Sequence, residues 1–477
     1  MRCLSESEFL LGILVEIASL FSVGFLGGIT NFDETLPGKV SWGTNHKYLP
    51  AYLPSMSAPV FNSKLCAICK GRKLLCGRPT CPILERFRVA RTVEQRLNKR
   101  HLFGSSPPSI FVGEYGYPKV RIGPLVPPIE GNTSHLDSPM KWEDKTIRDI
   151  LYYRSLLVMG ETKADVHVRR SGRILGEVQE LAMSIKPVDS EVLLKRKPVL
   201  KVLPSEFAPP IGPKAELLDF ELTENPKIPR RTDYVVSDEL KAEAAIMRLY
   251  TWGFDEYYII RLLSAGLLGL DKRLVPTRWS ITAVQDTIGK NLRREILHNP
   301  EINDYEVYFY RFMGNRYAVL LMPESYAFEL LEVWLKGSLF GASEPSVIHD
   351  YEDFRGRKEY VKETAGAYHA ARLSVLEALR ARRRQARAVV FREVTPEYYA
   401  PVGVWQIRLG VKKAMGNLIG RFETLNEALD AIKRRLEHPF EKYLARSYIL
   451  GSLARQKTLD EWLGKNLYRL GGEKPGG

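Results

Sequence analysis

Cysteine is scarce in this chain of 477 residues and is almost confined to one place. Of its five cysteines, four fall between positions 66 and 81, and only Cys3 lies elsewhere. A chain otherwise free of cysteine gives little support to a disulfide framework, and such a cluster of thiols is unusual in a secreted protein. Paired disulfides or ordinary reduced thiols are therefore the weaker explanation of this cluster.

Familiar catalytic motifs are also missing. The sequence contains no Walker phosphate loop, no G-x-S-x-G nucleophile elbow and no H-E-x-x-H metal motif. Whether the protein is an enzyme is therefore left open by its motifs.

Acidic residues are fewer than basic ones. The chain has 70 Lys and Arg against 56 Asp and Glu, which gives a formal net charge of +14. Such a balance favours an anionic partner, with nucleic acid the leading candidate, because the excess includes local arginine clusters. The alternative is a basic surface of the kind found in thermophiles, which need not bind anything.

The N-terminal region has an apolar run but lacks the other marks of a signal or anchor. Glu16 interrupts the run, Arg2 is the single basic residue before it, and no small-residue cleavage pattern follows. We expect translation to start at Met56, with residues 1–55 a non-native or disordered extension. The protein is accordingly predicted to have no membrane association.

The four clustered cysteines have the spacing of a metal site, C-x2-C-x6-C-x4-C. A C-x2-C pair places two thiolates on one tight turn, and a second pair nearby can complete a tetrahedral shell. Zinc in a structural role is predicted, because four protein ligands leave no open position for a substrate. An iron–sulfur cluster is the alternative, since a proline follows the last cysteine. The predicted ligands are Cys66, Cys69, Cys76 and Cys81.

Helical and strand patterns alternate in mixed order after this knuckle, which predicts an α+β fold with antiparallel hairpins. A basic helix follows the cysteines, strands are expected at residues 110–112 and 119–122, and a helical pair at residues 238–270. The clearest hairpin covers residues 306–323, around Gly314 and Asn315. Further predictions are an extended crossing at residues 187–231, a helix at 364–388, strands at 388–392 and 402–411, and a helix at 425–436.

These patterns suggest five regions. They are the extension at 1–55, the knuckle and basic helix at 56–100, a β-rich segment with the crossing at 101–235, a main α+β domain at 236–450 and a C-terminal tail at 451–477.

Two polar segments are candidates for binding phosphate. In LVPTRWSITAVQD, Ser280 is predicted to cap a helix starting at Ile281, which would place Arg278 beside exposed backbone N–H groups. A capped helix with Arg278 stacked on Trp279 is equally compatible with the pattern. The second segment is the end of the helix at 364–388, where arginines either complement the helix dipole or bind phosphate. Its candidates are Arg382, Arg383 and Arg384.

A glycine- and tyrosine-rich loop at residues 113–118 lies between the two strands at 110–122. Gly113, Gly116 and Gly123 would allow a ligand to approach the backbone, although glycines that merely close a hairpin explain each position equally well.

An acidic segment, IHDYEDFRGRKEY, supplies a weaker candidate for chemistry. His349, Asp350, Glu352 and Asp353 could ligate magnesium for phosphodiester chemistry, although neighbouring acids in a charged segment are more often simply solvated. With Arg278, His349 and Asp350 are the weak catalytic candidates.

The C-terminal tail carries QKTLDEWL, in which one short turn would present three apolar side chains together. Its key residues are Gln456, Leu459, Trp462 and Leu463. This segment resembles the sliding-clamp (PCNA) interaction box of replication and repair proteins, although Leu463 stands where an aromatic residue is usual.

The clamp box at one end and the cysteine knuckle LCAICKGRKLLCGRPTCP at the other make the chain similar to the archaeal Nre family of DNA repair proteins. The stretches SPPSIFVGEYGYPKVRIGPLVPP, LVPTRWSITAVQD and YYAPVGVWQIRLGV extend the resemblance from about Met56 to the end. The resemblance implies a role in DNA damage repair, coupled to the PCNA clamp in archaeal cytoplasm. It does not supply a reaction.

Two classes of function follow. The first is a clamp-recruited repair factor that binds DNA through basic patches, namely the 113–118 loop, Arg278 and Arg382–Arg384. The second is a hydrolase- or nuclease-like enzyme acting on damaged DNA or a modified nucleotide, with the loop and Arg278 forming its pocket.

Overall fold

The computed structural model describes residues 69, 73–75, 77, 81–167, 172–199 and 212–455. Its first sheet has six strands in the order β1-β5-β6-β4-β3-β2, with β4 and β6 parallel and the other neighbours antiparallel. The strands are β1 His101–Ser106, β2 Ile110–Val112, β3 Lys119–Val126, β4 Val158–Asp165, β5 Val188–Leu194 and β6 Lys214–Leu222. Strands β2 and β3 confirm the prediction for residues 110–122.

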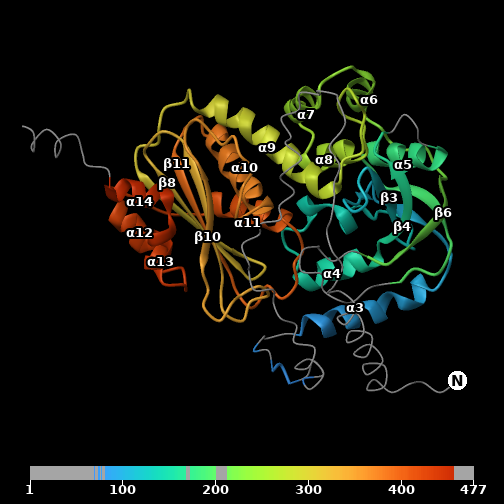
Figure 1. The fold of residues 1–477 in the computed structure, drawn as a ribbon, viewed down its shortest axis with the longest axis horizontal. Coiled ribbons are helices and arrows are strands. Elements are labelled where there is room, and N and C mark those ends of the chain that lie inside the picture. Colours follow the sequence, from blue (N-terminus) through green and yellow to red (C-terminus); the bar gives the residue numbers. More distant parts are fainter. Residues whose placement is uncertain are drawn as a thin grey trace, which may run out of the picture.

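Helices α3, α4 and α5 lie in the same half of the molecule as this sheet (Figure 1). Helix α3, Pro82–Leu97, follows the cysteine segment as predicted, and α4, Ile147–Leu156, begins with a capping box formed by Thr146 and Asp149. Helix α5, Arg173–Met183, connects β4 to β5 and packs on β6.

Four helices connect the two sheets: α6 Arg230–Ser237, α7 Ala242–Thr251, α8 Glu256–Ser264 and α9 Thr277–Ile296. Helices α7 and α8 confirm the predicted helical pair. The carboxylate of Asp255 accepts two backbone N–H bonds and fixes the start of α8.

The second sheet also has six strands, in the order β10-β9-β11-β8-β7-β12, and only β9 and β11 are parallel neighbours. Hairpin β7–β8 confirms the prediction, and it turns at Met313 and Gly314, both with positive φ. The strands are β7 Tyr305–Phe312, β8 Asn315–Met322, β9 Ala327–Trp334, β10 Val347–Glu352, β11 Arg387–Val394 and β12 Leu418–Phe422.

Each face of this second sheet is covered by helices (Figure 1). Helices α10, Gly366–Ala381, and α11, Trp405–Met415, cover one face, whereas α12 Leu425–Lys433, α13 Phe440–Arg446 and α14 Tyr448–Arg455 cover the other. Alternation along β8 explains this, since Val319 and Leu321 join one hydrophobic cluster and Leu320 and Met322 the other. The larger cluster continues into the first sheet, so the two halves share a core.

Mixed sheets and helices make the fold α+β, as predicted. Three local predictions were wrong. Residues 187–231 contain β5, β6 and the start of α6 instead of an extended crossing, because VDSEVLL and AELLDFEL alternate between buried and exposed positions despite the nearby prolines.

Residues 402–411 belong largely to helix α11, not to a strand. Residues Trp405 to Val411 are all buried, including Gln406 and Arg408. Apolar residues therefore alternate with polar ones or glycine as they do in a strand, although the segment is helical. The helix predicted at 364–388 ends at Ala381, because Arg383 takes a positive φ and the chain then enters β11.

Within the residues that the structure describes, no helix is both long and apolar enough to cross a membrane.

Candidate nucleic-acid interface

The glycine- and tyrosine-rich loop between β2 and β3 lies against the start of helix α9. The backbone N–H of Val112 donates to the hydroxyl oxygen of Thr277 over 2.9 Å, and Ser264 holds the same hydroxyl at 3.1 Å. The backbone of Val166 links the two segments, since its N–H donates to Pro118 and its carbonyl accepts from Leu274. Two segments that the sequence analysis singled out separately therefore form one surface.

Side chains extend this contact. The guanidinium of Arg278 lies 3.4 Å from the carboxylate of Glu114, and the rings of Tyr117 and Trp279 are 5.6 Å apart. Arg278 is thus paired with Glu114 in the loop, and Trp279 packs against Tyr117. The loop is fixed to the helix start by a backbone bond, an ion pair and a ring contact.

Three aromatic rings on this surface are open to solvent. Tyr115 is 87% exposed at the tip of the loop, Tyr117 is 43% exposed and Trp279 is 36% exposed. Rings of this size are normally buried or partnered, so a group of exposed rings indicates a binding surface.

Basic side chains adjoin the rings on the outer face of the β3–β4 pair. Lys119 and Arg121 alternate with buried Val120, and Arg121 stands directly opposite Lys163 on β4. Opposed like charges destabilise a strand pair unless an anion lies nearby. Glu161 pairs with Arg121 at 3.1 Å, whereas neither lysine makes an ion pair within the described part of the chain.

We define the aromatic–basic face as the side chains on these neighbouring segments that a nucleic acid could contact. Its members are Tyr115, Tyr117, Lys119, Arg121, Lys163, Arg278 and Trp279. Sequence reasoning missed Lys119, Arg121 and Lys163, although the alternation of charged and apolar residues around them was the signal that could have found them.

One expectation about this region was wrong, and of the two explanations left open for its glycines the structural one accounts for two positions. Helix α9 begins at Thr277, so Ser280 does not cap it; its hydroxyl is buried and donates to the carbonyl of Val275. The glycines at 116 and 123 serve the fold: Gly116 has φ +86° in the turn, and a Cβ on Gly123 would lie 1.6 Å from the Gly160 carbonyl.

The predicted arginine patch lies elsewhere, at the end of α10. Arg382 is engaged in a bidentate ion pair with Glu306 and also donates to Tyr308. Burial opposes ionisation of Glu306, but hydrogen bonds from Arg382, Tyr308 and Arg421 outweigh it and hold its pKa below the ordinary value. Arg382 is therefore committed to the fold, while Arg383 and Arg384 form no ion pair among the described residues.

The acidic segment at β10 does not form a metal site. Asp350 accepts N–H bonds from the backbone of residues 362–364 and pairs with Arg357 at 3.0 Å. Glu352 instead binds Tyr326 and Arg372. No group of three or more His, Cys, Asp or Glu side chains that could hold a metal occurs in the described ranges. The predicted convergence of these acids on magnesium was wrong.

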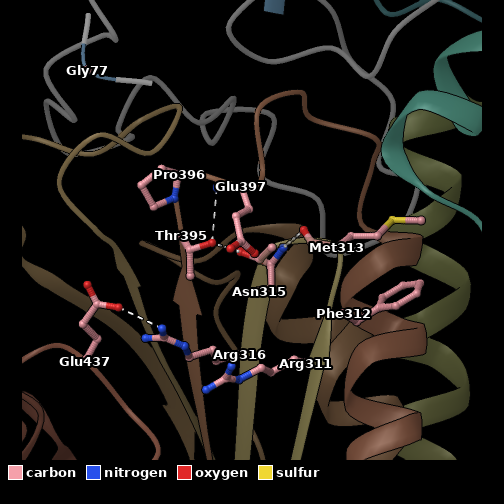
Figure 2. Close-up of a pocket in the computed structure, with 11 residues that line it drawn as sticks. Gly77, Arg311, Phe312, Met313, Asn315, Arg316, Thr395, Pro396, Glu397 and Glu437 are labelled. Carbon is pink, nitrogen blue, oxygen red and sulfur yellow. Dashed lines mark hydrogen bonds and ion pairs between the residues drawn. The ribbon is translucent and has the colours of Figure 1, made fainter. Parts of the chain in front are cut away.

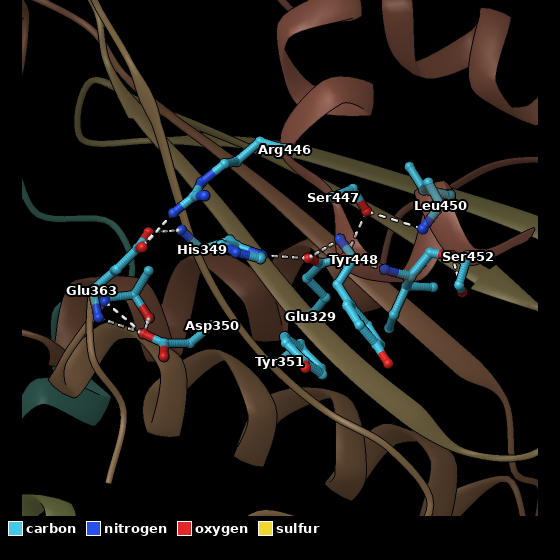
Figure 3. Close-up of polar contacts among 12 residues, drawn as sticks. Glu329, His349, Asp350, Tyr351, Glu363, Arg446, Ser447, Tyr448, Leu450 and Ser452 are labelled. Atoms are coloured by element: carbon cyan, nitrogen blue, oxygen red, sulfur yellow. Dashed lines mark hydrogen bonds and ion pairs between the residues drawn. The ribbon is translucent and has the colours of Figure 1, made fainter. Parts of the chain in front are cut away.

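His349 points to the opposite side of β10, toward the buried carboxylate of Glu329 (Figure 3). Glu329 accepts from the imidazole at 2.7 Å, from the Ser447 hydroxyl at 2.6 Å and from the backbone N–H groups of Tyr448 and Ile449. These bonds fasten the first turn of α14 to the second sheet. Sequence reasoning missed Glu329, which is one of two buried glutamates in β9.

Gly77, which lies between the third and fourth cysteines in the sequence, is near the β7–β8 turn. Cys66 and Cys76 are outside the described residues, while Cys69 is buried, Cys81 is partly exposed, and neither of these two forms a disulfide. Figure 2 shows Gly77 above a hollow of about 650 Å³ at the turn. Two of the four predicted zinc ligands, Cys69 and Cys81, are among the described residues, and the zinc site itself stays a prediction.

The clamp residues Gln456, Leu459, Trp462 and Leu463 also lie outside the described residues. They follow α14 directly, because that helix ends at Arg455.

Comparison with known proteins gives a consistent result across most of the chain. The model of the archaeal Nre N-terminal region matches residues 75–341, and that of the archaeal Nre C-terminal region matches residues 352–462. A protein of Archaeoglobus fulgidus named DNA repair protein NreA is 42% identical over 78% of this chain and 94% of its own length.

Two further relatives agree. DNA repair protein NreB of the same organism is 36% identical over 83% of this chain and all of its own length. DNA repair protein NreA of Haloferax volcanii is 39% identical over 70% of this chain and 83% of its own length. No solved structure matches this chain.

Proposed function

Because the chain belongs to the archaeal Nre family, we propose that it acts in DNA repair and binds DNA through the aromatic–basic face. The observation that carries this proposal is the convergence of three exposed rings and four basic side chains from three segments of the chain, the 115–121 segment, strand β4 and the start of α9. Basic side chains neutralise phosphates, and exposed rings offer stacking surfaces for bases.

Recruitment by a sliding clamp is the second part of the proposal. The box that contains Trp462 begins one residue after α14, and Glu329 fastens that helix to the body. A clamp bound there would hold the body close by rather than on a long tether. We further propose that the four cysteines bind a structural zinc ion and that the protein works in the archaeal cytoplasm.

DNA binding is tested by fluorescence anisotropy with labelled oligonucleotides over a series of salt concentrations. The triple variant Lys119→Ala, Arg121→Ala, Lys163→Ala should weaken binding to every DNA and lower the salt slope by about 2 to 3, because each phosphate contact contributes about 0.7–0.9. A matched triple variant removes exposed lysines elsewhere, at Lys336, Lys358 and Lys442. An equal loss of DNA affinity in both triple variants would show that net charge alone is responsible and would refute the proposed role of the aromatic–basic face.

Clamp recruitment is tested by titrating PCNA into the protein in a calorimeter. Trp462→Ala should abolish binding while circular dichroism is unchanged, since loss of a central aromatic anchor costs about 2 kcal/mol or more. Undiminished binding would discredit the box. Turnover of a damaged DNA substrate, lost in Arg278→Ala with the fold intact, would replace the binding proposal with the enzymatic alternative.

A further inference from the structure

The exposed rings of the aromatic–basic face indicate which kind of DNA it binds. We infer that it selects DNA containing unstacked bases, such as single strands, gaps and flipped nucleotides, over intact duplex. This inference rests on the proposed DNA binding and names the substrate class of the same face.

The exposed rings give the first reason. Tyr115, Tyr117 and Trp279 are exposed on two neighbouring segments, whereas large aromatic side chains such as Trp142, Tyr326 and Phe328 are fully buried. Stacking on a ring requires a base whose own face is free, and the bases inside a duplex have both faces covered. Phosphate contacts alone would need no rings.

The arrangement of charge gives the second reason. Arg278 lies next to Trp279 and is held by Glu114 in a solvent-exposed pair at 3.4 Å. Exposed pairs of this kind contribute little stability, so a phosphate can take the place of the carboxylate at small cost. The lysines on β3 and β4 add to the basic surface, in which Asp165 stands opposite Lys119. A strand can thus place a base on the rings while its backbone follows the basic side chains.

Rigidity gives the third reason. The Val112–Thr277 bond, the turn bond from the Lys119 N–H to the Gly116 carbonyl at 2.8 Å and the Tyr117–Trp279 contact hold the loop in place before any ligand binds. A preformed stacking surface loses less conformational entropy on binding than a mobile loop would.

The test compares a labelled single strand, its duplex and the same duplex with one internal gap, at one salt concentration. Wild-type protein should bind the single strand and the gapped duplex more tightly than the intact duplex. Tyr115→Ala and Tyr117→Ala should each weaken binding to the first two by about 5- to 150-fold, the range for one base stacked on one ring, and leave duplex binding unchanged. Tyr117→Phe, which keeps the ring, should retain the wild-type preference.

Matched controls separate stacking from damage to the fold. Tyr115 is so exposed that its removal leaves the core intact, and Phe354→Ala removes a 51% exposed ring from the loop after β10. A 2-aminopurine base in the single strand gives a direct readout, since its fluorescence should be quenched by wild-type protein and recover with Tyr115→Ala.

Each outcome decides a different point. If wild-type protein binds no DNA, the proposed function fails. If it binds strand and duplex equally and the tyrosine variants behave like Phe354→Ala, DNA binding stands and the selection of unstacked bases is refuted. Tighter binding to single-stranded RNA of the same sequence would also overturn the assignment to DNA.

Discussion

Histidine 369 is buried in a way that should make folding stability depend on pH. The residue lies in α10 with 6% exposure, and neither ring nitrogen has a hydrogen-bond partner in the part of the chain that the structure describes. Oδ1 of Asp286 is 3.6 Å from Nδ1 and also pairs with Arg372, while the other oxygen of that carboxylate pairs with Lys290. Burial lowers the pKa of His369 to about 4.

The sign and size of the effect follow from this pKa. An unfolded chain binds a proton at this histidine below about pH 6.5, while the folded chain resists protonation until about pH 4. The contribution of neutral His369 to the free energy of unfolding is therefore fully present above pH 6.5 and declines as the pH falls toward 4. Between pH 7 and pH 5 the free energy of unfolding should decrease by about 2 kcal/mol on this account.

Urea unfolding followed by far-ultraviolet circular dichroism at pH 7 and pH 5 measures this loss. His369→Gln should lose about 2 kcal/mol less than the wild type over that interval, because glutamine does not titrate. Burial also lowers the pKa of His438, but that residue is present in both proteins and its contribution cancels. His298→Gln, which removes an exposed imidazole, is the control. Identical pH dependence in the wild type and His369→Gln would refute the reasoning.

Three further outcomes are expected. Elemental analysis should find zinc in the wild type and lose it in Cys69→Ser, whereas iron in the wild type would select the cluster alternative. Gly176→Ala in α5 should stabilise the protein by about 1 kcal/mol, because a Cβ there would meet nothing within 4 Å. Gly410→Ala in α11 should destabilise it by about 1–3 kcal/mol, because the Cβ would lie 2.2 Å from the Tyr317 ring. Urea unfolding midpoints that shift in the same direction for both variants would contradict this. Glu329→Gln should speed hydrogen exchange across the first turn of α14, because bonds to a carboxylate contribute about 1.5–3 kcal/mol, and unchanged exchange would show that the helix is held by other contacts.

The fold could be predicted where local chemistry determined it. The β7–β8 hairpin was found because alternation on both sides of Gly314 leaves only one pairing, and α12 was found because its apolar stripe is flanked by the Thr424 cap. Helix α11 was mistaken for a strand because its polar residues Gln406 and Arg408 alternate with apolar ones and are buried as well, which gives the sequence a period of two.

The candidate site shows a different limit. The loop at 113–118 and Arg278 were each noticed, but the hydrogen bond that joins their segments connects residues 165 positions apart, and no local pattern reports such a contact. No local pattern predicts the contacts of the polar residues of β10 either. His349 and Asp350 point to opposite faces of the strand, and the role of each depends on its partners elsewhere in the fold. Proximity in sequence suggested a metal site, whereas Asp350 and Glu352 are each bound to different partners in the fold.

Buried ion pairs connect the half that carries the aromatic–basic face to the half that carries α14. Arg408 in α11 pairs with Glu256 in α8 at 2.9 Å and also with Glu377, and all three are largely withdrawn from solvent. Removing one partner of such a pair leaves a buried charge and costs about 3–5 kcal/mol, so the two halves should move as one body. Strand β3, which carries part of the proposed DNA surface, and helix α14, after which the clamp box begins, lie on different sides of that body in Figure 1. Binding at one surface should then raise the effective concentration at the other. A variant such as Glu256→Gln should therefore weaken clamp-assisted DNA binding more than it weakens binding to either partner alone, which comparison of the binary and ternary affinities would measure.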